Sequence, residues 1–315
     1  MIAAVKQIVI RTPLVGPSLR KARRWMAAAD RSLGRRFYAD NDAFSYHLRG
    51  QLALRRIRSR VAYVPRQEGP FSGDELRRRG LVLLPGLYAP DLVETIRRRV
   101  RETFDDPARL TPRQRPAADG RQYSWYIAEL ATVIPEIEAL LTPGLVASIE
   151  EYYRAHLAVK AVKCWRNLHV PPEAYREREV YSNRWHCDAT RPPGLLKLFY
   201  LVDDVCDEDG PLLVQPRPRT RELVRMGFGG RNDYRLTEGV MEDPKHMVKL
   251  TGPAGTVALY TTTRCLHRAS RPREGRHRDI IQLQLVPSTQ AFSPGWLDGR
   301  RTRLSSEEQG RVAND

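Results

Sequence analysis

Three side chains, two of them close together and one far along the chain, are suited to holding a metal ion. His186 and Asp188 are separated by one residue, and His267 follows 81 residues after His186. Residues i and i+2 of an extended segment point to the same side, so His186 and Asp188 can grip one ion. Two imidazoles and one carboxylate can occupy one face of a ferrous ion and leave its other positions open. The pattern therefore predicts a non-haem iron site.

A second His-x-Asp tripeptide, His277 to Asp279, has the same spacing, and spacing alone allows either pair to supply the ligands. Context favours the first pair. His186 precedes a turn-rich stretch and an apolar strand, whereas His277 follows the Arg-rich turn 272–276, where a solvated imidazole is the ordinary outcome. Three further histidines have predicted helix or loop contexts without a partner acid, which favours a surface or structural role. They are His156, His169 and His246.

An arginine follows the second candidate histidine near the start of a predicted strand. Arg278 comes eleven residues after His267. A guanidinium presents a fork of donors that matches a carboxylate, so this position suits an acidic cosubstrate. Arg276 is the alternative if the register of the turn differs by two residues, and a surface arginine in a basic turn is the other interpretation of Arg278.

Length, composition and cysteine use exclude several classes of protein. The chain has 315 residues, 41% hydrophobic and 29% charged, which suits a large globular body. No apolar run approaches the roughly 18 residues that cross a bilayer, and the N-terminus lacks a signal-peptide core. The four cysteines have no zinc-type spacing, so we expect a reduced, cytoplasmic chain. Cys187 and Cys265, which are close to the candidate ligands, either line the pocket or act as small buried side chains.

Positive charge is concentrated at the N-terminus. Residues 1–66 contain 15 Lys and Arg against three Asp, which is +12 of the net +16. Aromatic residues interleaved with arginines predict short amphipathic helices there. Contact with an anionic membrane surface or an acidic partner is one interpretation, and a solvated Arg-rich flank is the simpler one. Nucleic acid is not favoured, because no recognised binding motif accompanies the charge.

The rest of the chain changes from helical to strand-like patterns. The body begins near Phe71 with a helix that ends at Gly80, a buried strand at 81–84 and a helix from Pro90 to about 100. A loop is predicted at 105–122, with helices around 134–141, 143–155 and 219–226. Short strand-like runs separated by Gly and Pro turns are typical of an antiparallel sandwich or barrel. These runs are 158–165, 195–202, 212–215, 247–250, 256–260 and 280–286.

Four stretches between residues 71 and 288 resemble the phytanoyl-CoA dioxygenase family of iron(II)- and 2-oxoglutarate-dependent oxygenases. The first is ELRRRGLVLLPGLYAPDLVETIRR (75–98), and the second is Trp185 to Asp188. The third is LFYLVDDVCDEDGPLLVQP (198–216). The fourth runs from Gly255 to Leu285 and contains a His followed eleven residues later by an Arg. Order and spacing agree with the family, and not only residue types.

The resemblance implies a mainly β fold with added helices (α+β), a cupin-like double-stranded β-helix or jelly roll. It implies His186, Asp188 and His267 as Fe(II) ligands, and Arg278 as the partner of the distal carboxylate of 2-oxoglutarate. The implied activity is a dioxygenase that uses O2 to hydroxylate a C–H bond of a small molecule, with release of succinate and CO2. Asp188 fills the position that related halogenases leave small, which favours hydroxylation. We expect a basic helical extension (1–70), the oxygenase domain (71–290) and a polar tail (291–315).

The chain departs from the family pattern at two places. Gln215 to Thr220 replaces a Pro-Gly-Ser-His-like stretch, and Ala269 replaces a small hydroxyl residue. Several arginines favour an anionic substrate, although surface charge explains them equally well. They are Arg176, Arg178, Arg191, Arg217 and Arg219. Two other classes stay open: a non-catalytic metal-binding β-barrel, and a membrane- or nucleic-acid-associated adaptor that acts through residues 1–66.

Overall fold

A computed structural model describes residues 44–64, 69–113, 116–117, 119–177, 179–188, 194–228 and 236–297. The helices are α3 (Phe44–Ser59), α4 (Gly73–Arg79), α5 (Pro90–Phe104), α6 (Leu130–Val133), α7 (Pro143–Tyr153), α8 (Pro172–Glu177), α9 (Arg217–Arg225) and α10 (Glu238–Met241). Short 3-10 helices occupy Pro107–Arg109, Pro135–Leu140 and Asp207–Asp209. Among these residues, no helix combines the length and apolar character that spanning a bilayer requires.

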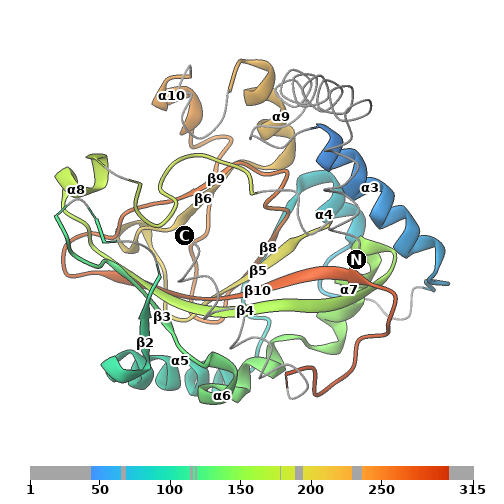
Figure 1. The fold of residues 1–315 in the computed structure, drawn as a ribbon, viewed down its shortest axis with the longest axis horizontal. Coiled ribbons are helices and arrows are strands. Elements are labelled where there is room, and N and C mark those ends of the chain that lie inside the picture. Colours follow the sequence, from blue (N-terminus) through green and yellow to red (C-terminus); the bar gives the residue numbers. More distant parts are fainter. Residues whose placement is uncertain are drawn as a thin grey trace, which may run out of the picture.

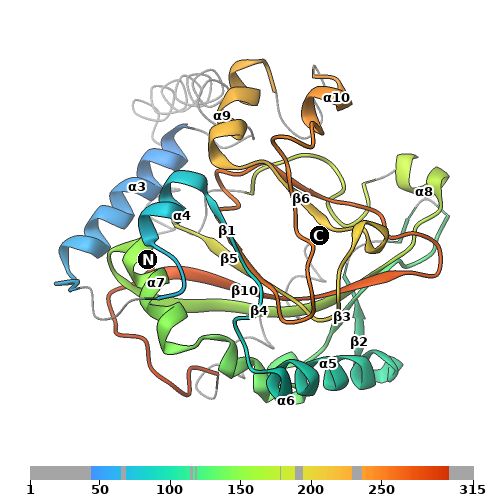
Figure 2. The same ribbon diagram turned by 180° about the vertical axis from the view of Figure 1, so that it is seen from behind.

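The strands form two antiparallel sheets. Their bounds are β1 (Leu81–Leu84), β2 (Leu110–Pro112), β3 (Ser124–Ile127), β4 (His156–Leu168), β5 (Leu196–Leu201), β6 (Leu212–Val214), β7 (Val248–Lys249), β8 (Val257–Tyr260), β9 (His267–Ala269) and β10 (His277–Ser288). The larger sheet has the order β1-β8-β5-β10-β4-β3-β2, and the smaller has the order β7-β6-β9. Figure 1 shows the two sheets facing each other, with α5 and α6 on the outer side of the larger one, and Figure 2 shows the same layers from behind.

The path of the chain between the sheets defines the architecture. From β4 onward, β4, β5, β8 and β10 belong to the larger sheet, whereas β6, β7 and β9 belong to the smaller one. The segment at His186, which follows β4, joins the smaller sheet through an antiparallel bridge to His267 of β9. This repeated exchange between two antiparallel sheets is a double-stranded β-helix. The predicted fold class is confirmed.

Alternation along the central strands separates the core from the cavity, because successive side chains of a strand point to opposite faces. On β5, the helix-facing side chains belong to the main core and the others line a cavity between the sheets. The core set is Leu196, Leu198 and Tyr200, and the cavity set is Lys197, Phe199 and Leu201. On β10 the core set is Ile281, Leu283 and Leu285, and the cavity set is Arg278, Ile280 and Gln282. The same strands that build the core therefore aim polar groups into the cavity.

Three local expectations are corrected. The predicted loop 105–122 contains a 3-10 turn and the short edge strand β2, which forms because it pairs with β3. No strand was predicted at His267, which lies within the short strand β9. His156 begins β4 and has an acid partner, since its Nδ1 is 3.0 Å from Glu150 Oε1. Short strands depend on cross-strand partners, which local patterns do not reveal.

The predicted boundaries at residues 70 and 290 stay predictions. Residues 1–43, and with them most of the predicted basic segment, lie outside the described residues. α3 packs on the body, where Arg58 Nε donates a 2.6 Å hydrogen bond to the carbonyl of Tyr153. Trp296 and Leu297 are buried in the main core, so packed structure continues past residue 290.

Candidate metal and carboxylate site

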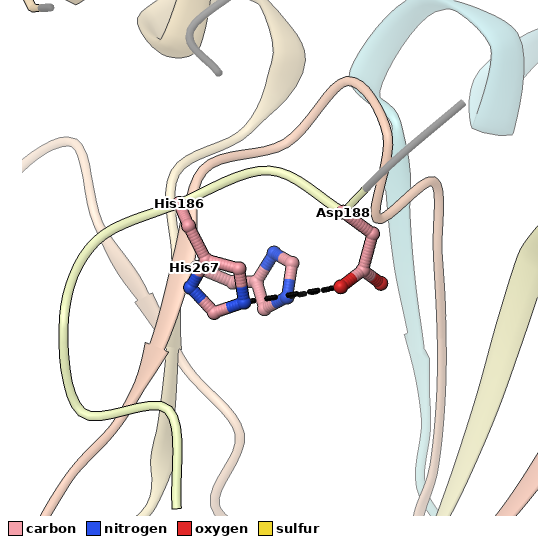
Figure 3. A group of neighbouring side chains, drawn as sticks. All are labelled: His186, Asp188 and His267. Carbon is pink, nitrogen blue, oxygen red and sulfur yellow. Dashed lines mark ion pairs between the residues drawn. The ribbon is translucent and has the colours of Figure 1, made fainter. Parts of the chain in front are cut away.

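Three side chains from two separate parts of the chain converge between the sheets. His186 and His267 exchange backbone hydrogen bonds of 3.1 and 2.9 Å, which places their imidazoles side by side with ring centroids 4.3 Å apart. The backbone N–H of Asp188 donates to the carbonyl of Thr262 at 2.9 Å, which fixes the third side chain. One ligand atom from each of the three residues lies within 4.8 Å of the others (Figure 3).

Both imidazoles are oriented by the backbone. His186 Nδ1 lies 2.8 Å from the carbonyl of Arg184, and His267 Nδ1 lies 2.9 Å from the carbonyl of Cys265. A carbonyl only accepts, so each Nδ1 carries a proton and Nε2 is the nitrogen left to bind a metal. Both Nε2 atoms lie 3.8 Å from Asp188 Oδ1. Metal-binding histidines are typically held by a hydrogen bond of this kind, and this set of two nitrogens and one carboxylate oxygen fits a divalent ion.

Asp188 is ionised and has a cationic neighbour. Lys197 Nζ lies 2.6 Å from Asp188 Oδ2, the carboxylate oxygen on the other side from the imidazoles. Burial acts to raise the pKa of Asp188, but the Lys197 ammonium and the two imidazoles outweigh it and hold the pKa well below its usual range. The ion pair is inside the cavity, so the carboxylate stays directed at the imidazoles.

Arg278 projects from β10 into the same cavity. Its side chain is buried, and its Nε and Nη1 have no hydrogen-bond partner among the described residues. Burial lowers the pKa of Arg278 to about 10. A buried guanidinium without a counter-charge costs free energy, so this end of the cavity is suited to an anion.

Asn167, on β4, adds a second buried donor beside Arg278. Its Oδ1 accepts from Arg113 Nη1 at 3.0 Å and from Ser124 Oγ at 2.7 Å. Because a guanidinium can only donate, the oxygen must face Arg113, and the amide nitrogen must face away from it. That nitrogen, Nδ2, is buried and has no partner among the described residues. The cavity therefore holds two neighbouring groups with unused N–H donors.

The cavity contains all four of the residues predicted for the site, along with several that were not predicted. Its lining comprises Arg113, Trp165, Asn167, Tyr181, Ser182, His186, Asp188, Lys197, Phe199, Leu201, Leu212, Leu250, Tyr260, His267, Ala269, Arg278, Ile280 and Gln282. Lys197 had a sequence signal, because it is the lone charge in the apolar run 195–202. Asn167 and Arg113 had none, since nothing local distinguishes them from ordinary strand and loop residues.

The competing residues lie elsewhere. Arg276 is half-exposed and lies 3.4 Å from Glu208, so of these two candidates Arg278 is the one that lines the cavity. His277 is exposed outside the cavity, and Asp279 accepts two hydrogen bonds from Arg166, at 2.8 and 2.7 Å. The second His-x-Asp tripeptide thus carries a structural ion pair.

Two cysteines and two arginines for which the sequence left a pocket role open are absent from the cavity lining. Cys187 packs in a separate apolar cluster, and Cys265 is buried, which raises its pKa to about 11. Arg217 donates to the carbonyl of Arg77, and Arg219 donates to that of Val240. For these two arginines the structure supports the alternative without a substrate role, because both bind backbone carbonyls of neighbouring segments. The side chains of Arg176, Arg178 and Arg191 lie outside the described residues.

No protein-family model and no curated protein sequence matches the chain. Solved structures do resemble it. One is the non-haem alpha-ketoglutarate-dependent epimerase SnoN from nogalamycin biosynthesis, with 15% identity over 75% of this chain and 82% of that one, and a TM-score of 0.49. The carbocyclase SnoK from the same biosynthesis has 20% identity over 75% and 94%, with a TM-score of 0.49. EctD from S. alaskensis, solved with 2-oxoglutarate and 5-hydroxyectoine, has 16% identity over 74% and 83%, with a TM-score of 0.48.

Proposed function

We propose that this chain is a non-haem Fe(II)- and 2-oxoglutarate-dependent dioxygenase. The observation that carries the proposal is a coincidence within one cavity. Two imidazole Nε2 atoms and a carboxylate oxygen face one another, and a buried guanidinium that has no hydrogen-bond partner among the described residues lies in the same space. The first group suits a ferrous ion and the second suits a carboxylate. An acidic cosubstrate that chelates iron satisfies both at once.

In this proposal His186, Asp188 and His267 hold the iron, and Arg278 holds the distal carboxylate of 2-oxoglutarate. Asn167 Nδ2 donates a second hydrogen bond to that carboxylate, since its own strand position faces Arg278. Bound iron and cosubstrate supply the oxidising power from O2, with succinate and CO2 as coproducts. The phytanoyl-CoA dioxygenase-like assignment rests on the sequence motifs alone.

The protein's own contribution is orientation and exclusion of water. The cavity walls include the apolar and aromatic side chains Phe199, Leu201 and Tyr260, all buried. Walls of this kind keep water from the reacting groups and strengthen charge interactions inside. We propose that a C–H bond of a small molecule is hydroxylated there, and Arg113 at the cavity wall favours an anionic one.

A non-catalytic metal-binding barrel accounts for the triad but not for Arg278. Such a protein has no use for a buried guanidinium with unused donors, and an apolar residue there would stabilise the fold more. The peripheral contact through residues 1–66 and the cytoplasmic location stay predictions, because the structure describes little of that segment.

The test combines spectroscopy with product analysis. Anaerobic addition of Fe(II) and 2-oxoglutarate should produce a visible charge-transfer band, and air should then produce succinate. His186→Ala should abolish both signals, whereas His246→Ala, at an exposed histidine outside the cavity, should keep both. An untargeted metabolite screen for the gain of one oxygen atom, with His186→Ala as the comparison, then finds the substrate. Absence of both the band and succinate from the loaded native protein refutes the proposal.

A further inference from the structure

Lys197 is a partly buried charge that the proposed chemistry does not by itself require. It lies on β5 with its side chain 14% exposed, in a strand whose other side chains are apolar or aromatic. Its ammonium contacts Asp188 Oδ2 at 2.6 Å, while Asp188 Oδ1 lies 3.8 Å from both imidazole Nε2 atoms. The two oxygens of one carboxylate are thus divided between two kinds of partner.

We infer that Lys197 is a positioning residue that limits Asp188 to binding the metal through one oxygen. The inference rests on the proposed function and deepens it. A carboxylate can bind a metal through one or both oxygens, and the facial arrangement leaves room for both a chelating cosubstrate and O2 only when the carboxylate takes one position. The ammonium occupies Oδ2 from the side opposite the imidazoles, so Oδ2 cannot turn toward the metal without losing its ion pair.

The position of Lys197 in the strand makes this restraint rigid. Lys197 pairs with Gln284 of β10 and Tyr260 of β8, so its backbone is held on both sides within the larger sheet. Asp188 is held from the opposite side by its backbone hydrogen bond to Thr262. Two fixed backbones with a short ion pair between them leave the carboxylate little rotational freedom.

The restraint has a cost that distinguishes it from a purely structural ion pair. An ammonium so close to the proposed ligand repels a divalent cation, so Lys197 weakens metal binding while it keeps a position open. Loss of the charge should therefore tighten metal binding and weaken cosubstrate binding. A lysine that only stabilised the fold would, on removal, weaken both together.

The experiment uses the full-length protein with Mn(II) in place of Fe(II), because the relaxation of water protons reports how many waters the ion carries. Mn(II) bound to Lys197→Met should carry about one water fewer than the three expected for a facial site. Lys197→Met should also bind Mn(II) about tenfold more tightly and 2-oxoglutarate about tenfold more weakly. Lys197→Arg, which keeps a cation, should restore the native water count. Lys249→Met makes the same chemical change at an exposed position on β7 and should match the native protein.

The possible outcomes separate the two proposals. A native protein that binds neither Mn(II) nor Fe(II) removes the proposed function, and this inference with it. The inference alone is overturned if the native protein binds metal and Lys197→Met leaves the water count unchanged. It is also overturned if Lys197→Met weakens the binding of both metal and cosubstrate. If Lys197→Met does not fold, Lys197→Gln, which keeps a donor without the charge, serves for the same three measurements with the same signs expected.

Discussion

Arg278 and Asn167 lie directly opposite each other on β10 and β4, and both have buried N–H groups without a partner among the described residues. Opposite residues of an antiparallel pair project to the same face, so the two side chains share one end of the cavity. Buried polar groups in folded proteins are rarely left unsatisfied. Two such groups side by side indicate a place prepared for a ligand rather than a packing fault.

Replacement of Arg278 should weaken cosubstrate binding and stabilise the metal-free protein. Arg278→Met should weaken 2-oxoglutarate binding by about 10- to 100-fold, since hydrogen bonds to charged groups contribute about 1.5–3 kcal/mol. The same change should raise the melting temperature of the metal-free protein, because it removes a buried charge without a partner. Calorimetric titration and thermal unfolding check the two effects, with Arg276→Met as the matched control at an exposed position. Equal cosubstrate affinity in Arg278→Met and native protein would contradict the assignment.

A single-atom change at Asn167 tests the second donor. Asn167→Asp keeps an oxygen for Arg113 and Ser124 but replaces the Nδ2 donor with a second acceptor and brings a negative charge to Arg278. We expect 2-oxoglutarate affinity to fall by at least about tenfold. We also expect the metal-free protein to be at least as stable as the native one, because Arg278 gains a counter-charge. If cosubstrate affinity is unchanged, Asn167 does not contact the ligand.

The ion pair between Asp188 and Lys197 predicts how stability depends on pH. The pKa of Asp188 is lowered in the folded state. Its contribution to the free energy of unfolding is therefore present above the unfolded pKa of about 3.9 and is lost as the pH falls through the folded value. Metal-free Asp188→Asn, which leaves Lys197 buried without a partner, should be less stable by about 3 kcal/mol near neutral pH. Urea unfolding should show this difference constant from about pH 8 to 5 and shrinking below about pH 4. A difference that grows toward acid would contradict the sign.

The four cysteines should differ sharply in reactivity. Cys206 is exposed, whereas Cys164, Cys187 and Cys265 are buried. Burial raises the pKa of Cys265 to about 11, so its thiol stays protonated in mildly alkaline buffer and is doubly protected. Brief treatment of the native protein with iodoacetamide at pH 8 should give one adduct, at Cys206, and unfolding in urea should give four. Peptide mass spectrometry checks the position, and early labelling of Cys265 would show that the site opens.

Local patterns in the chain were enough to predict most of the framework. Gly80 was expected to end a helix in the left-handed region, and it does so with φ of 75°. Apolar runs bounded by Gly and Pro turns predicted β5, β8 and β10, because buried strands need such runs whatever their partners are. The short strands β2, β3 and β9 were missed, since their existence depends on pairing with neighbouring strands and not on a local apolar run.

The candidate site also contains residues that the sequence predicted and residues that only the folded structure revealed. The i, i+2 spacing of His186 and Asp188 and the residue types of the distal pair His267 and Arg278 were open to prediction, because chemistry restricts which side chains bind iron or a carboxylate. Cross-strand register is a long-range property, so the unfolded chain carries no local mark of which residues it will bring together. Only the tertiary structure decided that Arg278 rather than Arg276 enters the cavity, and that Lys197 of β5 and Asn167 of β4 point into the same site.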